Sequence, residues 1–183
     1  MKFRSIILLL LVTVTSCNKN SDSLVAPEET VTAERHPQEG GNMDFFGKHN
    51  GMNGKTFWEL QKARAATARY RNLENAIADG YKDISVDVEE MGHHYLKKGL
   101  VDNVFDPAKP EILVYNRTES GRPYLVAVEY AIPINEPRPE GFSGTADVWN
   151  PSAEFQLWLL HAWVWAYNPE GVFNPTNPLI HLH

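Results

Sequence analysis

Cysteine is almost absent from this chain: Cys17 is the only one among 183 residues. A single thiol cannot close a disulfide within the chain. It also cannot supply the several thiolates of a structural zinc site or the two sulfurs of a redox pair. The folded part of the chain must therefore be stabilised by packing, and cysteine chemistry is excluded from any site within it.

Basic residues are also scarce, and the one aliphatic run at the N-terminus is short. Lys and Arg number 17 against 23 Asp and Glu, which gives a net charge of −6. Binding to nucleic acid and electrostatic attachment to anionic lipid both need clustered basic side chains, so this charge argues against both partners. The apolar run over residues 6–14 is too short to span a bilayer stably.

The N-terminus has the order of an export signal. Lys2 and Arg4 precede the apolar residues 6–14, and small residues lead to Cys17. This order resembles a bacterial lipoprotein signal peptide. The resemblance implies that residues 1–16 are removed and that Cys17 becomes an acylated N-terminus. An ordinary secretory signal followed by a chance cysteine is the alternative.

The same resemblance bears on location. Asn18 follows Cys17, where lipoproteins of some bacteria carry Asp when they are retained in the inner membrane. We therefore expect an exported protein held in the outer membrane by its lipid, facing the periplasm or the cell surface. Residues 17–54 are poor in aliphatic side chains and rich in Ser, Asn, Glu, Pro and Gly, which predicts a flexible tether. Residues 55–183 then form a single domain.

The domain is predicted to begin with one long helix. Thr56 and Glu59 have the spacing of a capping box, and Gly80 supplies a stop, so the pattern predicts a helix over residues 57–79. Apolar side chains at spacings of three and four predict its buried stripe as Ala66, Tyr70, Leu73 and Ile77.

After the helix the apolar period changes toward two, which is typical of strands. Four strands are predicted: Met91 to Leu96, Ile112 to Arg117, Pro123 to Ile132 and Gln156 to Tyr167. The turn residues 119–122 make the second and third of them a hairpin. These elements predict an α+β fold with one long N-terminal helix packed on a four-stranded, mostly antiparallel sheet. Such a fold is similar in outline to cystatin-like folds.

Three ionisable residues stand among apolar neighbours on the predicted strands. Alternation places Glu129 and His161 on apolar faces, and His94 lies in a third strand. If these faces coincide, two histidines and one carboxylate could hold a divalent transition metal with open positions. Two alternatives remain open. The three residues could form an internally satisfied buried group, or they could line a site for a ligand other than a metal.

The chain has five tryptophans, and large rings supply much of the buried area in a domain of this size. Most of them are therefore expected in the core, although an exposed subset would make a stacking platform for sugar rings. Trp163 and Trp165 share the predicted face of His161. We therefore expect Glu129, Trp163 and Trp165 to line any small-ligand cavity.

Several short motifs together resemble an uncharacterised family of bacterial exported proteins. The motifs are Ala78-Asp79-Gly80-Tyr81, Met91-Gly92-His93-His94-Tyr95, Val128-Glu129-Tyr130, Leu160-His161-Ala162-Trp163-Val164-Trp165, Asn168-Pro169-Glu170-Gly171-Val172-Phe173 and Asn177-Pro178. The resemblance covers about residues 63–178 and assigns the family's histidine to His94 rather than His93. Many members end in a cysteine soon after the Asn-Pro, whereas this chain has Leu179 to His181 there. The resemblance implies no established activity.

These observations predict a lipid-anchored envelope protein that binds a small ligand or a metal ion in an apolar cavity containing His94, Glu129 and His161. One alternative is a metal-assisted enzyme in which Glu129 is a ligand or a general base. The other is a cell-envelope interaction protein with no such site. The sequence assigns neither the metal nor a protein partner.

Overall fold

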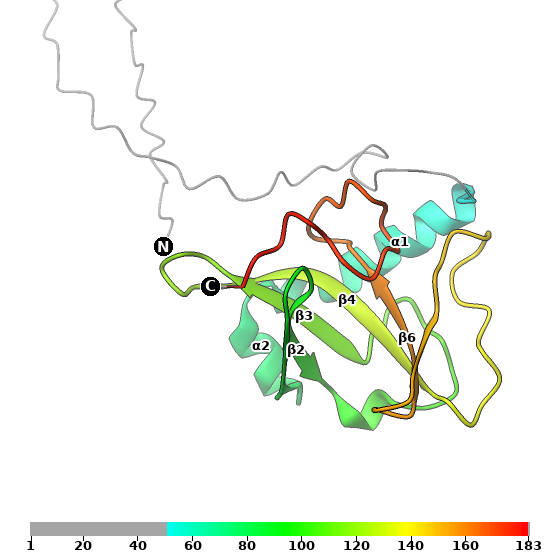
Figure 1. The fold of residues 1–183 in the computed structure, drawn as a ribbon, viewed down its shortest axis with the longest axis horizontal. Helices are drawn as coiled ribbons and strands as arrows, with labels where there is room; N and C mark the ends of the chain where they lie inside the picture. The colour runs from blue at the N-terminus through cyan, green and yellow to red at the C-terminus, as the bar shows by residue number, and fades with distance from the viewer. Residues whose placement is uncertain (1–50, 183) are drawn as a thin grey trace, which may run out of the picture. The chain divides into compact units, whose positions relative to one another are not determined.

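Residues 51–182 are described by a computed structural model, and they form an α+β fold (Figure 1). The predictions for the signal peptide, for Cys17 and for nearly all of the tether lie outside these residues. Among the described residues, no helix is long and apolar enough to cross a membrane.

The helical part is broken, and the predicted helix over residues 57–79 is wrong. It consists of α1 (Gly54–Thr67), the 3-10 helix η2 (Ala68–Arg71) and α2 (Leu73–Ala78). Asn72 has extended backbone angles (φ −91°, ψ 113°), and its side chain accepts the Glu74 N–H to begin α2. A polar side chain that satisfies backbone donors locally thus ends one helix and starts the next.

The predicted capping box is also displaced by three residues. The N-cap of α1 is Asn53, whose side chain accepts from the Lys55 and Thr56 N–H groups, while the Thr56 hydroxyl accepts from the Asn53 N–H. Glu59 instead accepts two hydrogen bonds from Ser143, one from its N–H and one from its hydroxyl. The buried residues of α1 accordingly differ from the predicted stripe and are Thr56, Glu59, Leu60, Ala63 and Thr67.

The sheet has six strands rather than four. Their order is β1-β2-β3-β4-β6-β5, and all neighbouring strands are antiparallel. The strands are β1 (Lys82–Val88), β2 (Gly92–Leu96), β3 (Ile112–Arg117), β4 (Pro123–Pro133), β5 (Asn150–Ser152) and β6 (Leu157–Ala162). The short helix η3 (Lys98–Leu100) follows β2. The broken helix and the additional strands also remove the basis for the predicted cystatin-like outline.

The four predicted strands form the middle of the sheet as β2, β3, β4 and β6, and the hairpin over residues 119–122 is confirmed. Its turn is closed by the Thr118 N–H, which donates to Arg122 O at 3.0 Å. The last strand is shorter than predicted and ends at Ala162, because the Trp163 N–H donates to Val172 O instead of to the neighbouring strand.

The two faces of the sheet are covered by different parts of the chain. Both helices lie on one side (Figure 1), where the Tyr115 hydroxyl donates to Tyr70 O. Residues 168–182, here called the C-terminal segment, cover part of the other face. This segment runs from β6 toward the turn between β1 and β2, since the Asn177 N–H donates to Glu90 O and His181 Nδ1 lies 3.0 Å from Glu89 Oε1.

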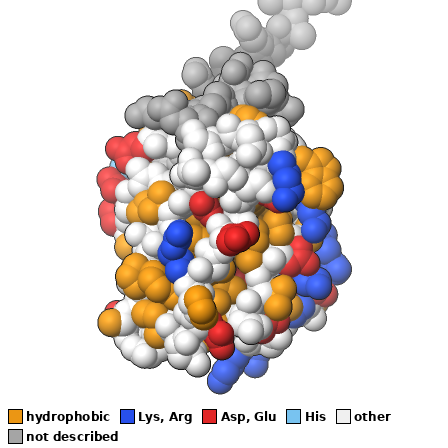
Figure 2. All heavy atoms as spheres, turned by 90° about the vertical axis from the view of Figure 1, so that its right-hand side faces the viewer, with side chains coloured by type: hydrophobic (Ala, Val, Ile, Leu, Met, Phe, Trp, Pro, Cys, Tyr) orange, Lys and Arg blue, Asp and Glu red, His pale blue; other side chains and the backbone are white. Residues whose placement is uncertain are grey.

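The outer surface is mixed in charge on the side drawn in Figure 2. Lys and Arg side chains gather mainly along one edge of that view, and acidic and apolar side chains lie between them. This side of the molecule therefore does not present a single sign of charge.

Candidate metal centre

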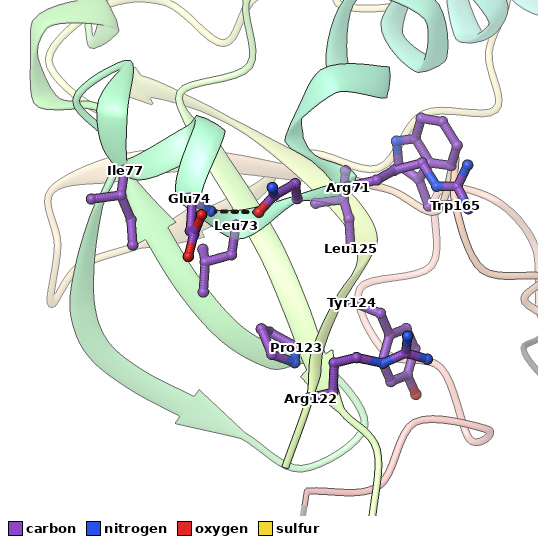
Figure 3. Close-up of a pocket in the computed structure, with 10 residues that line it drawn as sticks. Arg71, Leu73, Glu74, Ile77, Arg122, Pro123, Tyr124, Leu125 and Trp165 are labelled. Atoms are coloured by element: carbon purple, nitrogen blue, oxygen red, sulfur yellow. Dashed lines mark hydrogen bonds between the residues drawn. The ribbon is translucent and has the colours of Figure 1, made fainter. Parts of the chain in front are cut away.

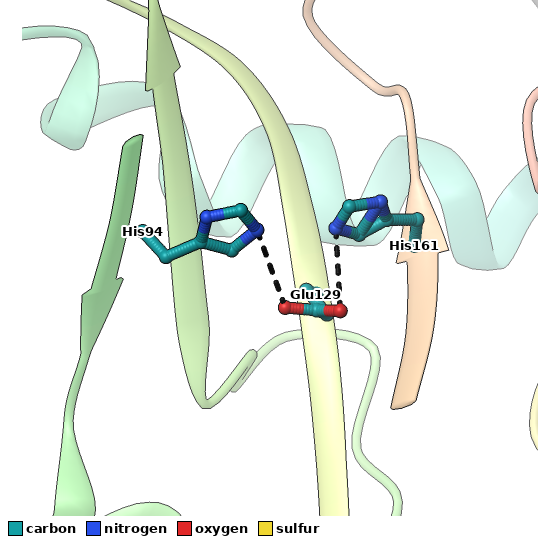
Figure 4. A group of neighbouring side chains, drawn as sticks. All are labelled: His94, Glu129 and His161. Carbon is teal, nitrogen blue, oxygen red and sulfur yellow. Dashed lines mark ion pairs between the residues drawn. The ribbon is translucent and has the colours of Figure 1, made fainter. Parts of the chain in front are cut away.

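His94, Glu129 and His161 lie together, as the sequence predicts, and are here called the triad (Figure 4). They come from β2, β4 and β6, with β3 between β2 and β4. Glu129 and His161 are paired directly in the register of β4 and β6, which places their side chains on the same face. Figure 4 shows the two imidazoles on either side of β4 with the carboxylate between them.

The distances within the triad suit a shared ion. His161 Nε2 lies 3.2 Å from Glu129 Oε1, and His94 Nε2 lies 3.8 Å from Glu129 Oε2. One ligand atom from each of the three residues lies within 4.8 Å of the other two. The imidazole rings are nearly parallel, with an interplanar angle of 16° and centroids 5.8 Å apart. Small movements would bring all three ligand atoms onto one cation.

The triad is almost completely withdrawn from solvent. The exposed fractions of the side chains are 5% for His94, 7% for Glu129 and 1% for His161. Glu129 is flanked along the same face of β4 by Ala127 and Ala131, whose small side chains leave room for the two imidazoles. The groups are thus held in surroundings where an unbalanced charge is costly.

Backbone carbonyls fix the orientation of both imidazoles. His94 Nδ1 lies 2.7 Å from Val86 O, and His161 Nδ1 lies 2.8 Å from Pro175 O. A carbonyl oxygen can only accept, so each Nδ1 carries the hydrogen and donates it. Nε2 of each neutral ring then presents its lone pair to Glu129. Metal-binding histidines are typically oriented by an outer hydrogen bond of this kind.

The two carbonyls come from irregular parts of the chain. Val86 lies in a bulge of β1 between Asp83 and Asp87, where Ser85 has a φ of 55°. Pro175 belongs to the C-terminal segment. Gly92 opens β2 with a φ of 121°, and a Cβ there would lie 2.5 Å from Tyr115 O, so only glycine allows β2 to approach β3 in this way.

Burial shifts all three triad residues toward their uncharged forms. It raises the pKa of Glu129 to about 8, with a smaller contribution from the negative charge of Glu111. It lowers the pKa of His161 to about 3, with His94 adding to the effect, and it also lowers the pKa of His94. The distances alone would permit ion pairs, but the cost of burying separate charges disfavours them at neutral pH.

One nitrogen of the triad is left without a hydrogen bond. His161 Nε2 is buried and has no hydrogen-bond partner among the described residues, although Glu129 Oε1 is only 3.2 Å away. Two lone pairs facing each other at this distance repel unless a proton or a cation lies between them. A buried polar atom without a partner needs an explanation of this sort.

The two predicted ligand-binding tryptophans lie in different places. Trp163 is buried, packs edge-on against His161 with ring centroids 5.6 Å apart, and donates its indole N–H to Asn174 O. Trp165 instead faces α1, where its indole N–H donates to the Thr67 hydroxyl. The structure therefore brings Trp163 to the triad and places Trp165 elsewhere.

A buried glutamate beside the sheet, Glu111, was missed by the sequence reasoning. Glu111 is 2% exposed, and its Oε2 accepts the Ala131 N–H at 3.0 Å. Burial raises its pKa to about 8. Its only signal in the sequence is an acidic residue directly before the apolar run of β3. The carbonyls of Val86 and Pro175 leave no such signal, because backbone groups are the same at every position.

Several of the motifs quoted above contribute to the triad or its support. Three of them supply His94, Glu129 and His161, and the Asn-Pro motifs lie in the C-terminal segment that supplies Pro175 O. Comparisons of the chain with family models, with curated proteins and with solved structures found no match. The resemblance to bacterial exported proteins stays a prediction that rests on the motifs.

Proposed function

We propose that this protein binds one divalent transition metal ion through His94 Nε2, His161 Nε2 and the Glu129 carboxylate. Two imidazole nitrogens and one carboxylate oxygen form a ligand set that suits Zn²⁺ and its first-row neighbours. Zn–N and Zn–O bonds of about 2.0–2.2 Å place the ligand atoms of a tetrahedral site about 3.3 Å apart. His161 Nε2 lies at about this distance, 3.2 Å, from one Glu129 oxygen, and His94 Nε2 lies 3.8 Å from the other oxygen.

The observation that carries the proposal is the unpartnered His161 Nε2. Its ring is already oriented by Pro175 O, and its lone pair points at a buried carboxylate oxygen. A divalent cation between them would displace the Glu129 proton, satisfy the nitrogen and balance the carboxylate charge. It would also leave the hydrogens on both Nδ1 atoms where the carbonyls require them.

Burial favours a binding role over catalysis at this site. Catalytic metal sites keep a position open to substrate, whereas the triad side chains are at most 7% exposed and lie partly beneath the C-terminal segment. With Glu129 as a ligand, the ion would tie β2, β4 and β6 to the C-terminal segment. A metal-assisted enzyme would need that segment to open.

Elemental analysis of the protein purified without an affinity tag tests the proposal. We expect about one equivalent of metal in the wild type and loss of that metal in His94→Ala and His161→Ala. His181→Ala is the matched control, because His181 is exposed and pairs with Glu89 rather than with the triad.

The possible outcomes separate the alternatives. Metal that persists in both triad variants would overturn the proposal. If the wild type carries no metal and binds none after dialysis against Zn²⁺, while both variants lose stability, the triad is a hydrogen-bonded core group in which Glu129 shares its proton with His161. If the wild type carries no metal and both variants are as stable as the wild type, a role in the cell envelope without this site is favoured.

We further propose that the protein is exported and anchored by lipid on Cys17, with the residues between Cys17 and the described fold as its tether, which shortens the predicted tether because Asn53 and Gly54 already belong to α1. The support is the order of basic, apolar and small residues before this cysteine. Cys17→Ser should prevent acylation and move the protein from the membrane fraction to the soluble fraction, which immunoblotting of fractionated cells would detect. An unchanged membrane fraction would contradict the anchor.

A further inference from the structure

The two oxygens of Glu129 face different imidazoles. Oε1 lies 3.2 Å from His161 Nε2, and Oε2 lies 3.8 Å from His94 Nε2. Figure 4 shows the carboxylate between the two rings, with one oxygen directed to each. An ionised carboxylate can bind a cation through one oxygen or through both. Both oxygens are turned toward ring nitrogens here, so a single ion among them could contact four ligand atoms.

The described residues around the triad offer no further side-chain ligand. Within this part of the chain, no other His, Cys, Asp or Glu side chain belongs to the group. The carbonyls of Val86 and Pro175 already accept the Nδ1 hydrogens of the two rings. Trp163 packs against His161, and its indole N–H donates to Asn174 O. The three triad side chains therefore supply every side-chain ligand atom that an ion at this place can reach.

A hollow large enough for a small molecule lies on the other face of the sheet (Figure 3). Its volume is about 640 Å³, and its walls include Leu73 and Ile77 of α2 and Leu125 of β4. Leu125 is paired with Tyr115, whose hydroxyl donates to Tyr70 O on the helix side. The triad lies on the opposite face, partly beneath the C-terminal segment, and Figure 4 shows a helix behind the sheet with the triad in front. This hollow therefore gives a substrate no access to the triad.

We propose that Glu129 binds the ion through both oxygens, so that the protein supplies all four ligand atoms and the site is closed. This coordination rests on the proposed function of the triad and gives the ion a structural role. Closed sites with four protein ligands are typical of structural Zn²⁺, whereas catalytic sites leave one position to water or substrate. A closed site should select Zn²⁺ and Co²⁺, which accept four ligands, over Ni²⁺, which favours tetragonal coordination, and Mg²⁺, which favours six oxygens.

Visible absorption of the full chain loaded with Co²⁺ tests this coordination, because the spectrum of Co²⁺ changes with its coordination number. We expect the strong bands of four-coordinate Co²⁺ and no change when excess azide is added, since azide needs an open position. Aqueous Co²⁺, whose water ligands azide can replace, is the control for the reagent. Bound Co²⁺ whose spectrum changes with azide would overturn the closed site and leave the metal site of the proposed function intact. A chain that takes up neither Co²⁺ nor Zn²⁺ would remove both.

Ion selectivity and a matched pair of variants give a second test. In competition, Zn²⁺ should bind at least about tenfold more tightly than Ni²⁺, and equal or tighter binding of Ni²⁺ would contradict four-coordination. Glu129→Asp should weaken Co²⁺ binding at least about tenfold, because the shorter side chain cannot bring both oxygens to the ion and a lost ligand atom costs no less than a lost outer hydrogen bond. Glu111→Gln is the matched control, since this buried glutamate lies outside the triad. Wild-type affinity in Glu129→Asp, with a spectrum that azide leaves unchanged, would show that the second oxygen is not a ligand.

Discussion

Two buried glutamates, Glu129 on β4 and Glu111 directly before β3, meet the cost of burial in different ways. Taken as whole residues, Glu111 and Glu129 are 2% and 5% exposed, and burial raises the pKa of each to about 8. Glu111 accepts a backbone N–H, whereas the oxygens of Glu129 face two imidazole nitrogens that have no hydrogen to give when they are neutral. The same residue type at the same depth is satisfied by the fold in one case and, in the other, needs its own proton or a cation between its carboxyl group and His161.

The position of Glu111 explains why it needs nothing further. It lies directly before β3, where the ladder between β3 and β4 ends, and its carboxyl accepts the N–H of Ala131 on β4. The Glu111 carboxyl thus accepts the Ala131 N–H that a backbone carbonyl of a longer β3 would otherwise accept. We interpret Glu111 as part of the structure of the sheet and Glu129 as part of a binding site.

The largest expected difference between the two glutamates is in the response to metal. At a Zn²⁺ concentration a hundredfold above Kd, binding to the folded state raises the free energy of unfolding by about 2.7 kcal/mol. Glu111→Gln should keep this increase and Glu129→Gln should lose it, since a neutral amide is a poorer ligand than a carboxylate. Urea unfolding with Zn²⁺ and with a chelator measures both. Equal responses from the two variants would remove the distinction drawn here.

The pH dependence that Glu111 adds to stability comes next, because the pKa difference sets only an upper limit on its size. Its pKa is about 8 in the folded protein against an ordinary value of 4.5, so the folded state holds this proton more tightly than the unfolded state does. The contribution to stability is therefore fully present below about pH 4.5 and is lost as the pH rises toward 8. The loss is on the order of 3–5 kcal/mol as an upper limit.

Glu111→Gln should remove this pH dependence, because glutamine does not ionise and its carbonyl can still accept the Ala131 N–H. The variant should gain stability relative to the wild type between pH 5 and pH 8.5, as measured by urea unfolding at both values in chelator. Glu119→Gln, on the exposed hairpin turn, is the control. Parallel profiles for Glu111→Gln and the wild type would show that the Glu111 carboxyl is ionised in the folded protein at neutral pH.

The sequence allowed the triad to be predicted because period-two alternation assigns each strand residue to a face. Once β2, β4 and β6 belong to one sheet, apolar neighbours such as Ala127 and Leu159 decide which face is covered. The register that pairs Glu129 with His161 then follows from strand pairing. The prediction held for residues in the middle of the sheet, where one face must be buried.

Elements without an apolar period could not be predicted in this way. β1 is an edge strand whose residues are exposed or half-buried and whose pairing is interrupted by a bulge, so it lacks an apolar pattern. β5 has three residues and contains Pro151. The break at Asn72 depends on one side-chain hydrogen bond, and the C-terminal segment is ordered by carbonyls such as Glu90 O. None of these features has a periodicity.

The smallest predicted effect concerns the C-terminal segment. This segment orients His161, and no contact described here joins it to Glu111 or Glu129. Asn177 is completely buried, its side-chain amide donates to Tyr167 O, and its side-chain oxygen accepts the Leu179 N–H. Asn177→Ala should lower the free energy of unfolding by about 1–3 kcal/mol through these lost hydrogen bonds.

The same variant should weaken metal binding about tenfold, since Pro175 O would orient His161 Nδ1 less firmly. Asn150→Ala is the control, because Asn150 lies on the edge strand β5 and its side chain bonds only to Val148 O among the described residues. Competition with a chromophoric chelator measures the affinity. If Asn177→Ala loses stability and keeps the affinity of the wild type, the outer hydrogen bond of His161 does not depend on this segment being held in place. The difference between Glu111 and Glu129 in metal binding would then depend on the triad side chains and not on the C-terminal segment.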